Sequence, residues 1–272
     1  LGQITGVAEE GMVQTDYPSI NLVSIPTEGH SLWEEVLTNR IDGTLMGSIS
    51  VPIYIELGDG NLKAVPDDCL AAPLFGSEWG NAVAESDPIL GYVESTIAEL
   101  KDNGEWDELI EYWYQPDVLR MGIDAPSGAS GARPAGVPAA GESAVVDRIY
   151  ENGVLRGGCA PTPPHCMVDP DTNEWIGLGP ETGKKLAEAM GVEYETVGVG
   201  WDAIVAGLPS GQFDVVVTGL TYRPERDEVV DFTILGQYGF CVLARADDDR
   251  VQTWDSFVDN PELRLGQIPG VS

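Results

Sequence analysis

The sequence is poor in positive charge. Its 272 residues include 14 lysines and arginines, of which four are lysines, against 45 aspartates and glutamates. The formal net charge at neutral pH is −31. Because a protein that binds nucleic acid needs cationic side chains to neutralise phosphates, this balance argues strongly against nucleic acid as a partner.

Long apolar runs and cysteines are also scarce. No run reaches the roughly 18 apolar residues of a membrane helix, and the printed sequence does not open with a signal peptide. Four cysteines are too few for a disulfide scaffold. Cys159, His165 and Cys166 have a spacing that suits a soft metal, but a fourth ligand is not evident. A local disulfide or unpaired thiols remain alternatives, and we expect no metal and no cofactor.

The most informative stretch is 213–232, FDVVVTGLTYRPERDEVVDF. Its apolar start predicts a buried strand, and a loop with hydroxyls, a glycine and two arginines follows. Thr218 and Thr221 offer hydroxyls, Gly219 lets a ligand approach the backbone, and Arg226 offers a planar fork of donors that matches a carboxylate. The pattern therefore indicates an anion site. The alternative is an ordinary strand-to-helix loop with a surface arginine.

This stretch belongs to a longer block that resembles a known family. The block from Gly177 to Phe232, with Ile176 before it, consists of IGLGPETGKKLAEAMG, GWDAIVAGLPSGQFDVVVTGL and TYRPERDEVVDF, in that order. In order and spacing they resemble the first half of the extracellular solute-binding proteins of family 3, the polar amino-acid transport type. Residues 1–115 resemble the second half of the same family in LGQITGVAEEG, NRIDGTLMGS and LKDNGEWDELIEYWY. The two halves therefore stand in reversed order.

The two ends of the chain repeat one another. Residues 1–7 read LGQITGV and residues 265–271 read LGQIPGV, so that they differ only at Thr5 and Pro269. Such a repeat indicates either a segment cut from a tandem array of modules or a circular permutation with duplicated ends. In both cases the two pieces could associate as one complete domain.

The resemblance implies an α/β fold of the periplasmic-binding-protein-like type II, with two α/β lobes joined by a hinge and with permuted halves. We expect strands at 20–25 and 41–46, two helices within 85–120 that are separated by a break at Asn103–Gly104, and a helix at 202–208. The second of the two helices carries Trp106 and Trp113, which we assign to the core. The expected domain bounds are 1–75 for the second lobe, 76–120 for the closing helices of the first lobe, 121–146 for a flexible linker rich in Gly, Ala, Pro and Ser, 147–247 for the first lobe, and 248–272 for the start of the second lobe.

The function that the resemblance implies is capture of a small solute between two lobes. A carboxylate would be held by Arg226, Thr221 and backbone amides, with Val7 or Ala8 of the opposite lobe donating N–H groups. Trp201 stands where the family uses an aromatic residue to cover the ligand, and it could instead fill the core. The closed form would be read by an ABC permease, and we expect a monomer outside the cytoplasm, periplasmic or attached to the cell surface.

Three positions depart from the family. Gly47 and Ala160 stand where acidic residues usually pair with the ligand's amino group, and Pro163 stands where an aromatic residue is common. A buried ammonium without an acidic partner is costly. We therefore expect a small carboxylate or an unusual amino-acid derivative, in preference to a cationic amino acid.

Two other classes of function stay open. One is an enzyme on the same fold, a dehydratase of prephenate-like acids, for which Glu181 is a candidate acid in the cleft. The sequence offers no convincing nucleophile–base pair, and its two histidines are His30 and His165. The other is a sensor or adhesive repeat whose pocket is vestigial.

Overall fold

The computed structural model describes residues 9–25, 32–69, 73–115, 133–201 and 203–267. The chain divides into two compact units. Unit 1 comprises residues 1–78 and 237–272, and unit 2 comprises residues 79–236. The chain passes from one unit to the other within two strands, β4 (Phe75–Ala84) and β10 (Val230–Arg245).

Unit 1 is built on a sheet with strand order β1-β11-β2-β10. Strand β11 is parallel to both β1 and β2, whereas β10 runs antiparallel to β2 and also to β3. The elements of this unit, besides its parts of β4 and β10, are α1 (Glu9–Asp16), β1 (Asn21–Ser24), α2 (Leu32–Leu37), β2 (Gly43–Gly47), α3 (Val51–Leu57), β3 (Leu62–Val65), α9 (Asp255–Asp259) and β11 (Arg264–Gln267).

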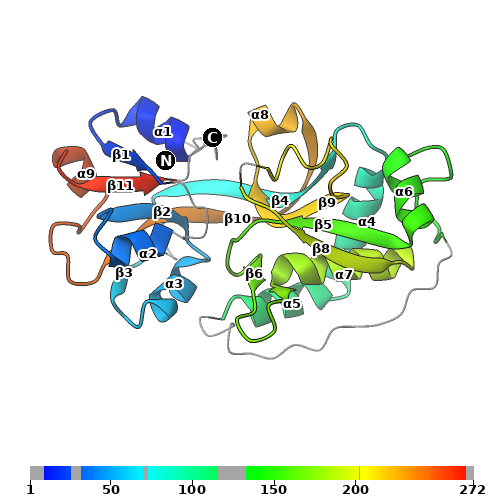
Figure 1. Cartoon of the computed structure of the whole chain (residues 1–272), viewed down its shortest axis with the longest axis horizontal. Helices are drawn as coiled ribbons and strands as arrows, with labels where there is room; N and C mark the ends of the chain where they lie inside the picture. The colour runs from blue at the N-terminus through cyan, green and yellow to red at the C-terminus, as the bar shows by residue number, and fades with distance from the viewer. Residues whose placement is uncertain (1–8, 26–31, 70–72, 116–132, 202, 268–272) are drawn as a thin grey trace. The chain divides into compact units, whose positions relative to one another are not determined.

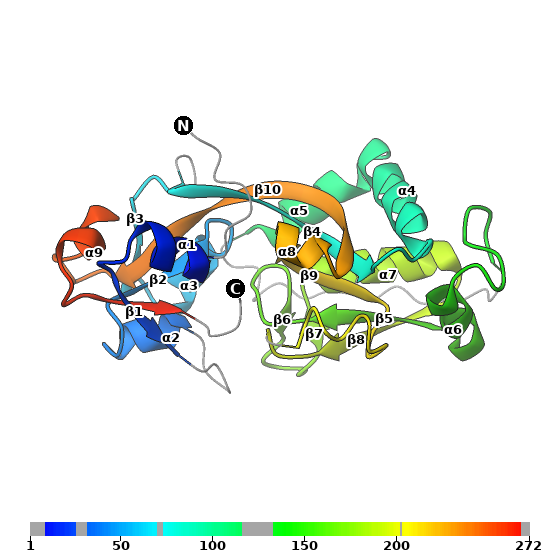
Figure 2. The ribbon, with the colours of Figure 1, turned by 90° about the horizontal axis from the view of Figure 1, so that it is seen from above.

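Unit 2 repeats this plan with the strand order β4-β9-β5-β8. Strand β5 is parallel to β8 and β9, and β4 runs antiparallel to β9. Helices α4, α5 and α7 gather on one face of the sheet (Figure 2). The elements are α4 (Ile89–Asp102), α5 (Glu105–Trp113), α6 (Ala144–Asn152), β5 (Val154–Cys159), β6 (Met167–Val168), β7 (Trp175–Ile176), α7 (Leu178–Met190), β8 (Glu193–Gly198), β9 (Val215–Thr221) and α8 (Pro224–Asp227), shown in Figure 1.

Local signals explain where the helices of unit 2 begin and end. The Ser143 hydroxyl accepts a hydrogen bond from the N–H of Val146 at 3.0 Å, which satisfies a free donor at the start of α6. Helices α6 and α7 both end on glycines in the left-handed region, Gly153 at φ 71° and Gly191 at φ 70°. Glycine adopts this conformation without the steric cost that a Cβ atom brings.

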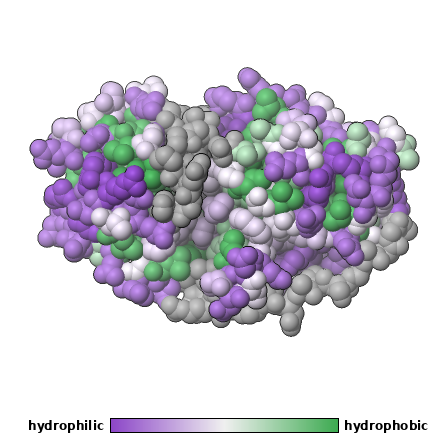
Figure 3. Space-filling model, viewed as in Figure 1, coloured by the Kyte–Doolittle hydropathy of each residue, from purple (hydrophilic) through white to green (hydrophobic). Residues whose placement is uncertain are grey.

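Apolar side chains fill separate cores in the two units. In unit 2 a buried cluster joins Ala82 of β4 and Ala160 to Phe213, Val216 and Leu220 around β9. In unit 1 the side chains of the two sheet faces form two further clusters. On the face that Figure 3 shows, hydrophilic residues predominate and hydrophobic ones are scattered, as the large negative charge leads one to expect.

Much of the expected organisation is confirmed. The fold is α/β, strands form at Asn21–Ser24 and Gly43–Gly47, and both predicted helices form within unit 2 as α4 and α5. Trp106 and Trp113 are 6% and 1% exposed, which confirms the assignment of both to the core. In the described part of the chain, no helix is long and apolar enough to span a membrane.

Other expectations differ from the structure. Residues 203–211 form successive turns, so the helix predicted at 202–208 is wrong, and residue 202 lies outside the described residues. The flexible linker was expected to reach residue 146, but α6 begins at Ala144. Residues 133–143 are tied to that helix, since Arg133 and the N–H of Gly141 both bond the carboxylate of Asp147. The boundary between the units falls inside the continuous strand β10, after residue 236, whereas the first lobe was expected to reach residue 247.

Candidate functional site

The carboxyl end of β9 carries an irregularity beside the predicted site. Along β4 the paired residue advances by two, from Gly80 to Ala82, while along β9 it retreats by four, from Leu220 to Val216. The extra residues make a bulge, a feature that commonly redirects side chains next to functional sites. Gly219 lies inside it at φ 70°.

His165 occupies the space next to Gly219. A Cβ atom on Gly219 would lie 2.6 Å from Nδ1 of His165, closer than real contacts allow. The imidazole also meets Trp79 edge-on, with 4.3 Å between ring centroids. The structure thus supplies a reason for glycine at this position other than the close approach of a ligand: a positive φ and a neighbouring ring.

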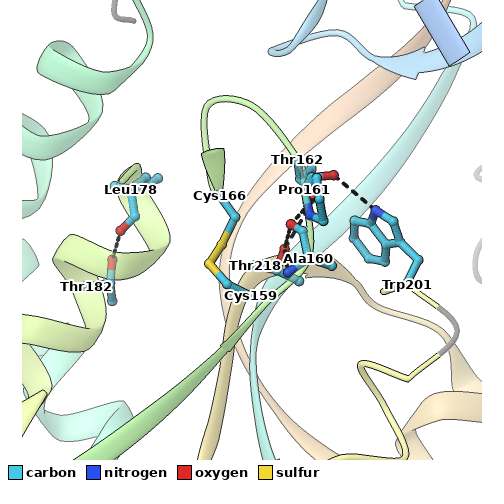
Figure 4. The surroundings of a disulfide bond; sticks show 9 residues. All are labelled: Cys159, Ala160, Pro161, Thr162, Cys166, Leu178, Thr182, Trp201 and Thr218. Carbon is cyan, nitrogen blue, oxygen red and sulfur yellow. Dashed lines mark hydrogen bonds between the residues drawn. A yellow bond between two sulfur atoms is a disulfide. The ribbon is translucent and has the colours of Figure 1, made fainter. Parts of the chain in front are cut away.

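Thr218 holds the loop after β5 against β9. Its hydroxyl accepts a hydrogen bond from the N–H of Ala160 at 3.1 Å and donates one to the carbonyl of the same residue at 2.6 Å (Figure 4). Thr218 is fully buried, and the hydroxyl of Thr162 lies 3.3 Å away. This arrangement gives the Thr218 hydroxyl a structural task, and the ligand contact stays a prediction.

Trp201 is fastened to the same loop. Its indole N–H donates a hydrogen bond to the carbonyl of Pro161 at 3.1 Å, as Figure 4 shows. The side chain is partly buried against the cluster that contains Ala160 and Leu220. Trp201 therefore packs on the core of unit 2 and keeps a partly exposed surface beside loop 160–166.

A disulfide closes this loop. Cys159 at the end of β5 is bonded to Cys166, seven residues later, and the backbone groups of Thr162 and Cys166 exchange two hydrogen bonds. The sequence left a disulfide, a metal site and free thiols open here, and the disulfide is correct. A second bond joins Cys69 and Cys241 in unit 1, which the sequence analysis did not anticipate. Among the described residues no group of three or more His, Cys, Asp or Glu could hold a metal ion.

Two arginines follow β9 and are both buried. Arg226, in the short helix α8, is 9% exposed, and its Nη1 donates to the carbonyl of Thr221 at 2.9 Å. Arg223, immediately before α8, is 3% exposed. Buried guanidinium groups are strongly attracted to anions because little solvent screens them. The sequence singled out Arg226 and passed over Arg223, although both stand in the printed TYRPER.

The electrostatics of His165 differ from those of the arginines. Burial lowers the pKa of its imidazole to about 3, because the charged form loses its hydration. Among the described residues neither ring nitrogen has a hydrogen-bond partner. His165 is therefore a neutral part of the interior at any pH above about 4.

The structure brings together part of the predicted set. Thr221 and Arg226 are joined directly, and Trp201 reaches Thr218 through loop 160–166. Val7 and Ala8 lie outside the described residues. At the positions that depart from the family, Ala160 is fully buried against Thr218, and Pro163 begins the Pro163–Pro164 cis peptide. Gly47 ends β2 in unit 1, where a Cβ would approach the ring of Tyr238.

Comparison with known proteins shows which family part of the chain resembles. Residues 155–264 match the family model described as bacterial extracellular solute-binding proteins, family 3. The match covers less than half of the chain, and over these residues the chain is similar to this family. The match includes β5, α7, β9 and α8, and so contains every described residue of the candidate site in unit 2.

Three curated proteins are similar to this chain over part of its length. The L-cystine-binding protein TcyJ of Escherichia coli (strain K12) is 29% identical over 34% of this chain and 35% of its own length. A Haemophilus influenzae protein named "Probable amino-acid ABC transporter-binding protein" is 27% identical over 41% of this chain and 44% of its own. Cyclohexadienyl dehydratase of Pseudomonas aeruginosa is 26% identical over 46% and 47%. The chain thus spans about half or less of the length of these relatives.

Proposed function

We propose that this chain is an extracytoplasmic solute-binding protein that captures a small carboxylate or amino-acid-like ligand and delivers it to an ABC permease. The ligand's acid group would be bound by the guanidinium of Arg226, at the carboxyl end of β9. Binding without turnover is the activity that this site supports best.

The observation that carries the proposal is the burial and fixed position of Arg226. Its Nη1 is held by the carbonyl of Thr221, which fixes the direction of the planar guanidinium. At 9% exposure, the group meets little competition from water. Thr221, which is partly exposed beside it, could donate its hydroxyl to the same acid group.

The departures at Gly47 and Ala160 bear on the rest of the ligand. Neither residue can offer a carboxylate to an ammonium group. Ala160 is also fully buried, and its backbone N–H is bonded to the Thr218 hydroxyl. This position therefore offers the ligand no acidic side chain. We therefore propose a small carboxylate or an uncharged amino-acid derivative, and we expect cationic amino acids to bind poorly.

The proposed compartment agrees with the cysteines. All four are paired, as Cys69–Cys241 and Cys159–Cys166. Structural disulfides persist in the periplasm and outside the cell and are rare in the reducing cytosol. Delivery to a permease is taken from the named role of the Haemophilus influenzae relative.

A thermal-shift panel tests the proposal. The panel contains small mono- and dicarboxylates, neutral amino acids, cystine and arginine, applied to the wild type and to Arg226→Ala. A compound that raises the Tm of the wild type and leaves the variant unchanged would support capture through Arg226. If both proteins melt cooperatively and no compound shifts the wild type, the proposal fails.

An enzyme is the second candidate, because one relative is named cyclohexadienyl dehydratase. The acid that the sequence offered for this chemistry is Glu181, in the first turn of α7. Its carboxylate is bonded to Lys184 at 2.7 Å, and a carboxylate held by an ammonium group is poorly placed to give a proton to a substrate. Incubation with prephenate, followed by detection of the product, would distinguish turnover from binding.

A further inference from the structure

Three strands of unit 2 end at one edge of its sheet. Strand β5 is parallel to both β8 and β9, so the carboxyl ends of all three lie on the same side. Ligands of open α/β sheets bind outside these ends. Loop 160–166 follows β5, Trp201 follows β8, and Arg226 follows β9. What the first two present at this edge therefore bears on the part of a ligand that lies away from its acid group.

Loop 160–166 exposes only a short segment at this edge. Its first residue and its last three are buried, whereas Pro161 is exposed and Thr162 and Pro163 are partly exposed. A ligand that touches the loop therefore meets residues 161–163.

The polar hydrogens of residues 161–163 all belong to Thr162, because proline has no backbone N–H. The N–H of Thr162 donates to the carbonyl of Cys166 at 2.8 Å, and its own carbonyl accepts from the N–H of Cys166 at 2.9 Å. The Thr162 hydroxyl donates to the carbonyl of Ala160 at 3.0 Å. These bonds leave the segment with its proline rings and a threonine methyl group as the surface for a ligand.

The side chain of Trp201 adds to this surface. Its indole N–H donates to the carbonyl of Pro161, so the indole and the loop use each other's polar groups (Figure 4). The side chain is partly buried, and its remaining atoms are ring carbons. We call residues 161–163 and the Trp201 side chain the apolar platform.

We propose that the ligand is a monocarboxylic acid whose other end is a hydrocarbon group, best an aromatic ring, that lies on the apolar platform. The assignment rests on the proposed function, in which Arg226 binds the acid group. An ammonium group or a second carboxylate buried against the platform would lose its hydration without gaining a hydrogen-bond partner there. A hydrocarbon group gains from leaving water, and a flat ring can also stack on the indole.

Four small acids test the assignment on the full chain by NMR titration: acetate, phenylacetate, succinate and L-phenylalanine. Each buried methylene group tightens binding roughly fourfold, so phenylacetate should bind at least about 30-fold more tightly than acetate. Succinate replaces the ring with a second carboxylate, and L-phenylalanine adds an ammonium group. Both should bind at least about 10-fold more weakly than phenylacetate. If either binds as tightly as phenylacetate, the assignment is overturned.

Variants of Trp201 locate the hydrocarbon group. Trp201→Ala should weaken phenylacetate at least about 10-fold and leave acetate unchanged, and Trp201→Phe, which keeps a ring, should restore most of the loss. The matched control is Trp33→Ala, because Trp33 is also partly buried and packs on Tyr54 in unit 1. It should change neither affinity. Equal losses for acetate and phenylacetate in Trp201→Ala would show that Trp201 only supports the fold, and would contradict the assignment.

Arg226→Ala separates this assignment from the proposed function. If none of the four acids binds the wild type, or if Arg226→Ala binds acetate as well as the wild type does, the proposed function fails and the assignment falls with it. If Arg226→Ala weakens acetate but phenylacetate has no advantage over acetate on the wild type, the acid site stands and the hydrocarbon group alone is refuted.

Discussion

Asp214 accepts two kinds of hydrogen bond from Arg156. The backbone N–H of Arg156 reaches Oδ2 at 2.8 Å and its guanidinium reaches Oδ1 at 3.0 Å, while Arg148 adds an ion pair at 2.5 Å. Asp42 and Arg264 repeat this geometry in unit 1, with Arg250 in the place of Arg148. In both units the aspartate directly precedes a central strand and the arginine lies on the parallel neighbour, so one device fixes the strand register twice.

Asp214→Asn should destabilise the protein by about 3 kcal/mol, because the substitution leaves two arginines beside a buried amide. Asp214 is 1% exposed as a side chain, so solvent cannot replace the lost charge. Urea unfolding measures the loss. Asp147→Asn, which removes the more exposed partner of Arg133, is the matched control and should cost less. Equal losses in the two variants would refute the structural role of Asp214.

Asp42, the counterpart of Asp214 in unit 1, should make the free energy of unfolding depend on pH in the acid range. Burial opposes ionisation of Asp42, but hydrogen bonds from Arg264 and Arg250 outweigh it and hold its pKa below the ordinary value. Because the folded pKa is the lower one, the contribution is present above about pH 4 and is lost as the pH falls further. Arg264→Ala should reduce this dependence in urea titrations between pH 5 and about pH 3. If Arg264→Ala left the pH dependence of the unfolding free energy unchanged, the pairing of Asp42 with Arg264 would not be the cause of that dependence.

His165 should make the free energy of unfolding depend on pH in a higher range than Asp42 does. Its folded pKa of about 3 lies below the ordinary 6.5, so its neutral form stabilises the fold above about pH 6.5 and this contribution is lost as the pH falls towards 3. The loss approaches about 1.4 kcal/mol per pH unit for one buried group.

The measurement compares the wild type with His165→Gln. Unfolding free energies from pH 7 to about pH 4 should fall more steeply in the wild type, because the variant has no imidazole to protonate. Parallel slopes would show that the imidazole becomes charged as easily in the folded protein as in the unfolded one.

The two disulfides should differ in their effect on stability. Cys69–Cys241 links residues 172 positions apart, and Cys159–Cys166 links residues seven apart. Loop-closure entropy gives about 5 kcal/mol for the long loop and about 2.5 kcal/mol for the short one. Thermal unfolding of the two paired Cys→Ala variants should therefore show the larger fall in Tm for Cys69/Cys241. The reverse order would mean that the contacts of loop 160–166 depend on its disulfide beyond chain entropy.

The sequence predicts what depends on local pattern. The helices at Ile89–Asp102 and Glu105–Trp113 follow from apolar spacing, and Arg226 follows from a motif that occupies neighbouring positions. The contact of Gly219 with His165 could not be predicted, because the two residues meet only after β9 bulges next to loop 160–166. The same holds for Cys69 and Cys241, which are far apart in sequence. The helix predicted at 202–208 is wrong because an apolar spacing that suits a helix also suits successive buried turns.

The most direct test of the account is calorimetry of a ligand found in the panel, beside its primary carboxamide. The two compounds have nearly the same shape, and only the acid offers a charged, bidentate partner to Arg226. The account predicts that the carboxamide binds the wild type at least about 100-fold more weakly than the acid, and that Arg226→Ala removes most of this difference. Equal Kd values for acid and carboxamide on the wild type would contradict the central claim that a buried arginine captures a carboxylate.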